Sequence, residues 1–158
     1  MKLNGIRIRP MGPLDLPTAV QIHREAFGLE AWDGRAIADI MAMPGATGRI
    51  AVDSTLGDHR PLGFSLLLLV ANDAELLTVA VALTARRHRV GMSLVEDFLD
   101  IGTEAGATNA FLEVAEDNLP AQRLYARLGF RQEGVRRDYY RRPGNRRVAA
   151  HLLRRRLP

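Results

Sequence analysis

Residues 111–130, FLEVAEDNLPAQRLYARLGF, place a charged side chain inside an apolar run and so constrain the fold more than any other stretch. Ala110–Val114 has the length of a buried strand and is bounded by polar residues. The period of two puts Phe111, Glu113 and Ala115 on one face. An ionised carboxylate beside an aromatic ring must be solvated, paired or neutralised, because an isolated buried charge is costly. Glu113 is therefore a candidate functional residue.

A helix is expected directly after this strand. Asn118 is its predicted N-cap, Pro120 suits its first turn, and Gly129 ends it. Helical spacing is kept by the apolar positions Ala121, Leu124, Tyr125 and Leu128. The stretch thus offers a carboxylate on a strand, a helix N-terminus just behind it, and a phenol on that helix.

The size and composition predict an ordinary globular domain. A chain of 158 residues favours one domain, residues 1–158, and 47% hydrophobic with 25% charged residues is typical of soluble proteins. The longest apolar run, Leu66–Ala71, is too short to span a bilayer, and no signal-peptide core follows the first residues. The absence of cysteine excludes disulfides and thiolate metal sites, and cytoplasmic residence is the default expectation.

Alternation and turn residues predict seven strands and four helices. The expected strands are Gly5–Pro10, Thr47–Val52, Leu62–Ala71, Glu75–Val81, Ala110–Val114, Gly134–Tyr140 and Val148–Leu153. The expected helices are one capped by Asp15, then Arg35–Met43, Val90–Ala105 and the one after Asn118. Turns at Gly57-Asp58 and Asn72-Asp73 indicate an antiparallel meander of the second to fourth strands. This order predicts a mixed α/β sheet with helices on both faces.

The net charge of +4 is unevenly distributed. Residues 131–158 contain ten arginines against only Glu133 and Asp138. Such a tail could meet nucleic acid or another polyanion. The arginines interleave with a strand pattern, however, which favours ordinary strand residues, so direct nucleic-acid binding is not the favoured expectation.

A candidate anion site lies before the third helix. Arg86, Arg87 and Arg89 gather where that helix begins, and free backbone N–H groups at a helix N-terminus favour an anion. Cations there oppose the helix dipole, so a diphosphate ligand would explain them; a solvated basic loop is the alternative. The histidines have no ligand spacing, so no metal site is expected, and His88 is expected to be exposed rather than catalytic.

These motifs together resemble a known family. Arg86–Gly91 resembles the acetyl-CoA pyrophosphate signature of the GNAT acetyltransferases, (Gln/Arg)-x-x-Gly-x-(Gly/Ala). The spacing of Glu113, Asn118 and Tyr125 looks like the RimI branch, the bacterial alanine acetyltransferases that act on the N-terminus of a small-subunit ribosomal protein. Further matches to that branch are Glu75–Val81, Arg136–Tyr140 and the early Trp32.

The resemblance covers nearly the whole chain and implies the remaining features of fold and site. It implies a mostly antiparallel seven-stranded sheet, splayed between the fourth and fifth strands, in a single N-acetyltransferase domain. Acetyl-CoA would be the co-substrate, with no metal, and the N-terminal α-amine of a ribosomal protein the acceptor. The implied cofactor-binding residues are Val79, Ala80, Val81, Arg86, Arg87, His88, Arg89, Val90, Gly91, Met92 and Asn118. Trp32, Tyr139 and Tyr140 would line the acceptor pocket.

Two residues carry the implied chemistry. Glu113 would take the proton of the amine, directly or through a water, and Tyr125 would protonate the departing sulfur. The alternatives from the residues alone are an ion pair between Glu113 and an arginine, and an ordinary core tyrosine at position 125. Asn118 would touch the pantetheine arm, cap the helix, or do both.

One position departs from the family signature. Arg89 stands where the signature has its first glycine, and a Cβ there costs on the order of 1 kcal/mol if the position needs a positive φ. Its guanidinium would instead reach the phosphates if the side chain is functional. The alternative functions are acetylation of another protein or a small amine, and a degenerate acetyltransferase fold that serves as a basic RNA- or protein-binding module.

Overall fold

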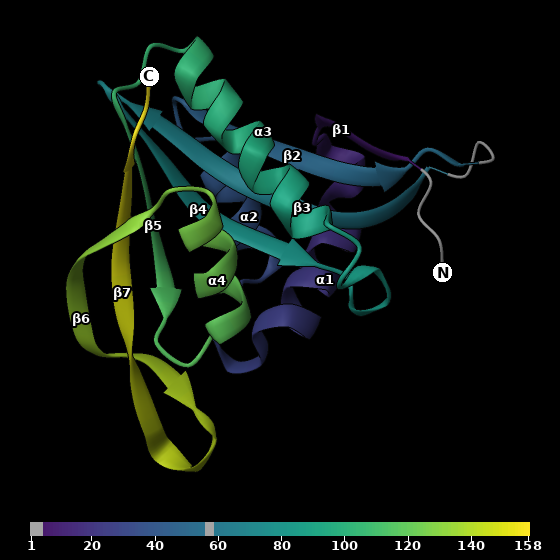
Figure 1. Cartoon of the computed structure of the whole chain (residues 1–158). Coiled ribbons are helices and arrows are strands. Elements are labelled where there is room, and N and C mark those ends of the chain that lie inside the picture. Colours follow the sequence, from purple (N-terminus) through teal and green to yellow (C-terminus); the bar gives the residue numbers. More distant parts are fainter. Residues whose placement is uncertain (1–4, 56–58) are drawn as a thin grey trace.

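The computed structural model describes residues 5–55 and 59–158 and shows a twisted mixed sheet between two pairs of helices (Figure 1). The strands are β1 Ile6–Pro10, β2 Ala46–Asp53, β3 Arg60–Val70, β4 Asp73–Val81, β5 Asn109–Ala115, β6 Arg131–Arg142 and β7 Arg146–Arg156. The helices are α1 Leu16–Phe27, α2 Gly34–Met41, α3 Val90–Glu104 and α4 Leu119–Arg127. The predicted order of elements is confirmed, and the turn at Gly57-Asp58 lies outside the described residues.

The sheet has the order β1-β2-β3-β4-β5-β7-β6. Its neighbours are antiparallel except for β4 and β5, which run parallel. Pairing of β4 with β5 runs from Asp73 opposite Asn109 to Leu76 opposite Leu112, and there it ends. The prediction of a seven-stranded, mostly antiparallel sheet that splays between its fourth and fifth strands is therefore confirmed.

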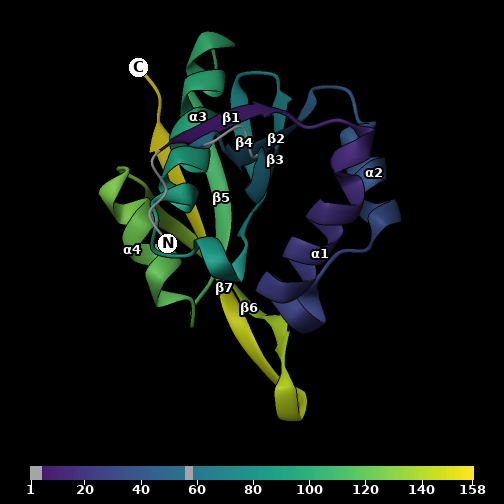
Figure 2. The same cartoon turned by 90° about the vertical axis from the view of Figure 1, so that its right-hand side faces the viewer.

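Helices cover both faces of the sheet. Figure 2 shows α1 and α2 on one side and α3 and α4 on the other. Phe64, Ile50 and Ile37 belong to the core under α1 and α2, where they are fully buried. Phe98 and Val95 of α3 pack with Leu112 of β5 in a second core under α3 and α4. Burial of these side chains from water on both faces is the main term that stabilises the layers.

The first helix begins differently from the sequence prediction. Asp15 occupies the N-cap position of α1, but its side chain makes no capping hydrogen bond. The carboxylate instead accepts two hydrogen bonds of 2.8 Å from the Arg9 guanidinium and one of 2.8 Å from the backbone N–H of Gly12. The predicted side-chain cap is wrong because a bidentate arginine pair is a stronger partner for a carboxylate than a helix N–H.

Candidate active site

The gap between β4 and β5 originates at a β-bulge. Opposite β3, the register skips Leu77, since Leu66 pairs with Thr78 and Leu67 pairs with Leu76. A bulge bends its strand and increases the local twist. The bulge therefore lies where β4 leaves β5, and Val79–Val81 continue to pair with β3 alone. The β5-facing edge of this segment can pair with an extended ligand in the manner of an added strand.

The arginine-rich loop enters α3 through two left-handed residues. Arg87 has φ 63° and Arg89 has φ 64°, and Arg89 is the N-cap of α3 without a side-chain capping bond. The position of the signature glycine therefore does require a positive φ. The backbone N–H groups of Val90, Gly91 and Met92 begin α3 and have no partner within the helix. Exposed guanidinium groups around such N–H groups make the loop suitable for an anion.

This loop lies beside β4 and α4. A Cβ placed on Gly91 would sit 3.5 Å from a methyl of Leu124 and 3.6 Å from a methyl of Val81. Leu124 precedes Tyr125, so the anion loop, the open edge of β4 and the tyrosine helix are neighbours. His88, in the same loop, is half-buried, and its Nδ1 lies 2.7 Å from the carbonyl oxygen of Arg86. His88 thus helps to shape the turn.

Glu113 forms an ion pair on the face opposite α3 and α4. Its Oε1 lies 3.0 Å from Nε of Arg136, and its side chain is 25% exposed. The second carboxylate of this region is Glu75, which sequence reasoning did not single out. Partial burial raises the pKa of Glu75, the charge of Glu113 raises it further, and Arg136 opposes both. Two carboxylates that share one guanidinium leave net negative charge for an incoming ammonium group.

Tyr125, on α4, packs against the other face of β5. It is 6% exposed and packs in the core that contains Leu112 and Val114, with its ring edge-on to Phe130 at 5.9 Å. Burial, followed by the neighbouring Tyr140, raises the pKa of Tyr125. Among the described residues its hydroxyl has no hydrogen-bond partner. The phenol is therefore neutral at physiological pH and keeps its proton available.

The paired tyrosines of β6 lie at an irregular part of that strand. Register is lost between Arg136 and Tyr140, and Asp138 in this segment has φ 50°. The rings of Tyr139 and Tyr140 meet nearly at right angles, with centroids 5.0 Å apart. Burial, then the charge of Glu113, raises the pKa of Tyr140 to about 12. Because Tyr140 also acts on Tyr125, it lies within electrostatic reach of both predicted catalytic groups.

Ion pairs attach the β6–β7 hairpin to this region. Arg141 Nε lies 3.2 Å from Glu30, just after α1, and Arg142 lies 2.7 Å from Asp117, just before α4. Next to Asp117, the Asn118 side-chain oxygen accepts a hydrogen bond of 3.3 Å from Ala121 N–H. The predicted N-cap is therefore confirmed, and the amide nitrogen of Asn118 is left for another partner.

A buried histidine connects α1 to β4, and sequence reasoning missed it. His23 is 1% exposed and stacks between Phe27, at 4.4 Å, and Trp32, at 5.0 Å. Its Nδ1 accepts the Trp32 backbone N–H at 3.0 Å, so its Nε2 carries the proton toward Thr78 Oγ1 at 3.1 Å. The ring therefore ties the Trp32 loop to the strand that leads into the open segment. The sequence does contain one sign of its burial: His23 follows Ile22, which lies on the apolar face of the expected helix.

The His23 environment predicts a loss of stability in acid. Burial lowers the pKa of His23 to about 4, whereas the unfolded chain takes up that proton near pH 6.5. Between these values the unfolded state binds more protons, so this contribution is complete above pH 6.5 and is lost as the pH falls toward 4. We expect about 2 kcal/mol less free energy of unfolding at pH 4.5 than at pH 7 from this group. Urea denaturation of wild type and His23→Gln at both pH values measures it, and parallel losses in the two proteins would contradict it.

The structure thus gathers most of the predicted residues around the β4–β5 gap. Val79–Val81 and the Arg86–Met92 loop lie on the side of Tyr125, and Tyr139 and Tyr140 on the side of Glu113. Trp32 is half-buried and approaches this region only through its stacking on His23. In the described part of the chain, no group of three or more His, Asp or Glu side chains could hold a metal ion. None of the helices described has the length and apolar character needed to cross a bilayer.

Comparison with known proteins gives one consistent result. The model of the Acetyltransferase (GNAT) family matches residues 20–130. The [Ribosomal protein bS18]-alanine N-acetyltransferase of Salmonella typhimurium is 31% identical over 139 residues, which are 87% of this chain and 88% of that protein. The crystal structure of the ribosomal-protein-S18-alanine N-acetyltransferase from Escherichia coli superposes with a TM-score of 0.87 at 24% identity, covering 97% of this chain and 94% of that one. Arabidopsis thaliana NAA60 in complex with a bisubstrate analogue gives 0.84 at 21% identity, over 97% and 98% of the two chains.

The match of the family model covers well over half of the chain and includes both the arginine loop and the strand-helix unit of Glu113 and Tyr125. The fold agrees with it in the parallel β4–β5 pair and in the gap that follows. The chain belongs to the GNAT family and is an acetyl-CoA-dependent N-acetyltransferase.

Proposed function

We propose that the protein transfers the acetyl group of acetyl-CoA to the N-terminal α-amine of alanine on ribosomal protein bS18. The observation that carries this proposal is the 31% identity, over nearly the full length of both chains, to an enzyme named for that reaction. Residues 1–158 act as a single N-acetyltransferase domain. The site of action is the cytoplasm, where ribosomal proteins are made.

The open edge of β4 would hold the cofactor. Backbone N–H groups at the start of α3 and the guanidinium groups of Arg86, Arg87 and Arg89 would hold its diphosphate, together with His88, Val90, Gly91 and Met92. The backbone of Val79, Ala80 and Val81 would pair with the pantetheine arm, because their edge toward β5 has no strand partner among the described residues. The Asn118 amide nitrogen donates to this arm while its oxygen caps α4. Bound there, acetyl-CoA supplies the acetyl thioester, and the residues present fit it.

Glu113 acts as the base. The acceptor reaches it as an ammonium group, attracted by the carboxylates of Glu113 and Glu75. Glu113 takes a proton from the amine, directly or through a water, and Arg136 at 3.0 Å holds its carboxylate in place. Backbone N–H groups of β4 beside the bulge donate to the carbonyl oxygen as it gains charge.

Tyr125 acts as the acid. Burial raises the pKa of Tyr125, and this keeps its hydroxyl protonated. A hydroxyl that has no partner among the described residues can donate a hydrogen bond to the departing thiolate. Glu113 and Tyr125 lie on opposite faces of β5, and this suits a cofactor that passes between them through the gap.

Trp32, Tyr139 and Tyr140 bind the acceptor. Tyr139 is 46% exposed and Tyr140 is half-buried beside Glu113, so the pair forms one wall of the entrance. Leu29, exposed after α1, is tied to the strand that carries this wall, because its carbonyl accepts a hydrogen bond of 3.0 Å from Arg141. Trp32 acts through the position of its loop, which His23 fixes.

The acceptor class is tested by initial rates on a panel of amines. We expect kcat/KM to be highest for a peptide with an N-terminal Ala and a bS18 sequence, and at least about tenfold lower when Ala is replaced by a bulky residue. An N-terminally blocked peptide that contains an internal lysine is the control for lysine acetylation. Faster acetylation of small amines than of any peptide would contradict the proposal.

Replacing Arg89 separates its two possible roles. Alanine keeps a Cβ at the positive-φ position, so Arg89→Ala removes the guanidinium without removing the backbone cost. We expect the Kd of acetyl-CoA to rise about tenfold, because a charge-assisted phosphate contact is lost. Isothermal titration measures it, with Arg35→Ala, an exposed arginine on α2, as the control. Unchanged affinity in Arg89→Ala would show that the arginine is merely tolerated, and Arg89→Gly should then bind more tightly.

A further inference from the structure

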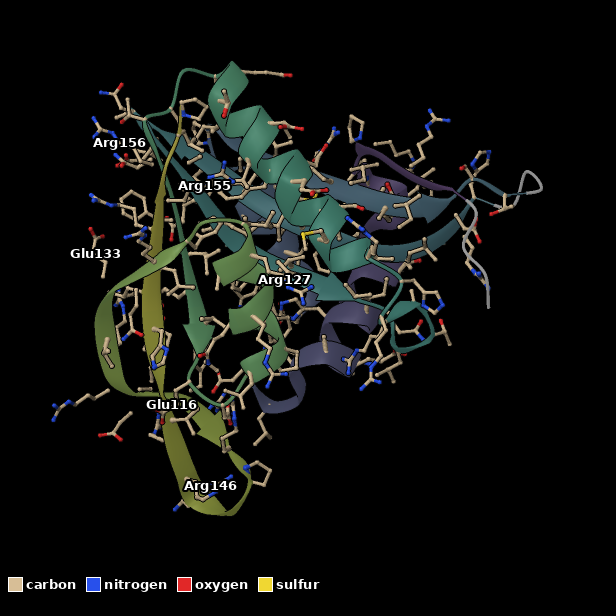
Figure 3. The ribbon with its side chains drawn as sticks, viewed as in Figure 1. Glu116, Arg127, Glu133, Arg146, Arg155 and Arg156 are labelled. Carbon is tan, nitrogen blue, oxygen red and sulfur yellow. The ribbon has the colours of Figure 1, made fainter. Side chains whose placement is uncertain are left out.

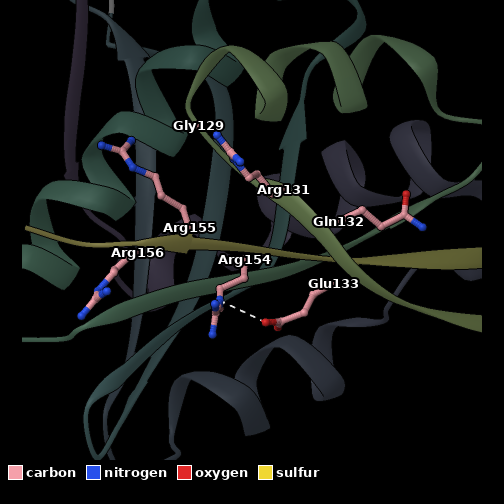
Figure 4. A pocket seen from close by; sticks show the side chains of 7 residues that line it. All are labelled: Gly129, Arg131, Gln132, Glu133, Arg154, Arg155 and Arg156. Atoms are coloured by element: carbon pink, nitrogen blue, oxygen red, sulfur yellow. Dashed lines mark ion pairs between the residues drawn. The ribbon is translucent and has the colours of Figure 1, made fainter.

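A cleft unrelated to the cofactor loop lies at the far end of β7. It has a volume of about 390 Å³. Figure 4 shows its lining, which comes from the first residues of β6, the last residues of β7 and the turn that ends α4. The lining residues are Gly129, Arg131, Gln132, Glu133, Arg154, Arg155 and Arg156. Four of these residues are arginines, one is a glutamate, and none has an apolar side chain.

Only two of the four arginine side chains have partners within the described part of the protein. Arg154 lies 3.1 Å from Glu133 in an exposed ion pair, and Arg155 donates a hydrogen bond of 2.8 Å to the carbonyl of Leu128 at the end of α4. Arg155 thus has a structural role as a C-terminal helix partner. Arg131 and Arg156 are exposed and have no ion pair with any residue in the described ranges. The lining therefore carries an excess of positive charge, which favours an anionic ligand.

The cleft is separate from the diphosphate loop. Arg156 pairs with Asn109 at the start of β5, and the next residue, Leu157, donates its N–H to Thr108 beside the C-terminal end of α3. The loop of Arg86–Arg89 lies at the N-terminal end of the same helix, which has 15 residues and a length of about 22 Å. Figure 3 shows Arg155 and Arg156 at this C-terminal end of α3. An anion bound in the cleft would therefore be separate from the diphosphate of the cofactor.

The cleft lies within reach of the reaction centre. Along β7, Arg156, Arg154 and Leu152 pair with Asn109, Phe111 and Glu113. Glu113 is four residues from the Asn109 end of β5, a distance of about 13 Å along the strand. A ligand in the cleft would therefore lie beside an acceptor bound at Glu113.

Against the expectation from the sequence, we propose that this cleft binds the phosphate backbone of a nucleic acid. Guanidinium groups bind phosphate through paired N–H donors, and the lining offers them without the apolar or aromatic anchor on which protein partners depend. Such a contact holds the enzyme on a ribonucleoprotein while the protein N-terminus enters the active site. The proposal for the cleft does not depend on the acceptor of the acetyl group. A failed peptide assay would therefore contradict the proposed function only, and a failed nucleic-acid titration would contradict the proposal for the cleft only.

The test compares two double variants with the same loss of charge. Arg131→Gln with Arg156→Gln removes the unpaired arginines of the cleft. Arg7→Gln with Arg35→Gln removes exposed arginines on β1 and α2, away from β6 and β7. Fluorescence anisotropy with a short labelled RNA, and with DNA of the same sequence, gives the Kd as a function of salt concentration.

We expect the cleft variant to bind RNA about tenfold more weakly, with its salt slope reduced by about 1.4, equivalent to two phosphate contacts on a single strand. The control variant should stay within about twofold of wild type, and both variants should keep wild-type kcat on a short peptide. If RNA binding were weakened equally in the two variants, the effect would come from net charge and not from the cleft, and the proposal would be overturned. Equally tight binding of poly-glutamate would also overturn it, because the cleft would then bind acidic protein.

Discussion

Replacement of Glu113 by glutamine is expected to lower kcat for α-amine acetylation by roughly ten- to thousandfold, with little change in the Kd of acetyl-CoA. Glutamine keeps the size of the side chain and removes the only atoms at this position that can accept a proton from the amine. The side chain is 25% exposed, so the substitution leaves no large unsolvated cavity. Steady-state kinetics with an Ala-starting peptide and isothermal titration of acetyl-CoA measure the two quantities.

The ion pair with Arg136 provides the control for this prediction. If Glu113 served only to hold Arg136, then Arg136→Gln would lose as much activity as Glu113→Gln. We expect Arg136→Gln to lose less, since it leaves the carboxylate in place and removes only its partner at 3.0 Å. Equal losses in the two variants would assign Glu113 a structural role.

Replacement of Tyr125 by phenylalanine is expected to lower kcat by a similar factor of roughly ten to a thousand, again without loss of acetyl-CoA binding. The ring stays in the core against Phe130, and the hydroxyl has no hydrogen bond to a described residue that would be broken. The free energy of unfolding should therefore change by less than about 1 kcal/mol. Chemical denaturation checks stability, and steady-state kinetics checks kcat.

Tyr140 is the matched comparison for Tyr125. It is also a partly buried phenol, and its pKa is raised to about 12, so it too is protonated at neutral pH. We expect Tyr140→Phe to raise KM for the peptide more than it lowers kcat, because Tyr140 lies beside Glu113, where we propose that the acceptor binds. A larger fall in kcat for Tyr140→Phe than for Tyr125→Phe would move the acid role to Tyr140.

Local signals carried most of the fold prediction. The alternation around Glu113 and the cap at Asn118 depend on neighbours in the sequence, and both are found in the structure. The ends of β6 were predicted less well, since Arg131–Arg142 extends beyond the expected Gly134–Tyr140. The additional residues pair with β7, and a strand end set by its partner leaves little trace in its own sequence.

The parts of the site that could not be predicted depend on long-range contacts. Glu75 approaches Glu113 only because β4 and β5 pair in parallel with Glu75 opposite Phe111, a register that no local pattern encodes. His23 is neutral because burial lowers its pKa, and its two hydrogen-bond partners, Trp32 and Thr78, come from other elements. The positive φ of Arg89 could not be predicted from the residue itself, because arginine has no preference for the left-handed region. The family signature, which has glycine at this position, was the only indication of it.

The measurement that tests this account most directly is mass spectrometry of a peptide with an N-terminal Ala and a bS18 sequence after incubation with acetyl-CoA and the protein. We expect the peptide to gain the mass of one acetyl group, and fragmentation to place that group on the α-amine. The reaction should be strongly reduced with Glu113→Gln. A peptide that keeps its mass, or an acetyl group on a lysine side chain instead, would contradict the proposed function.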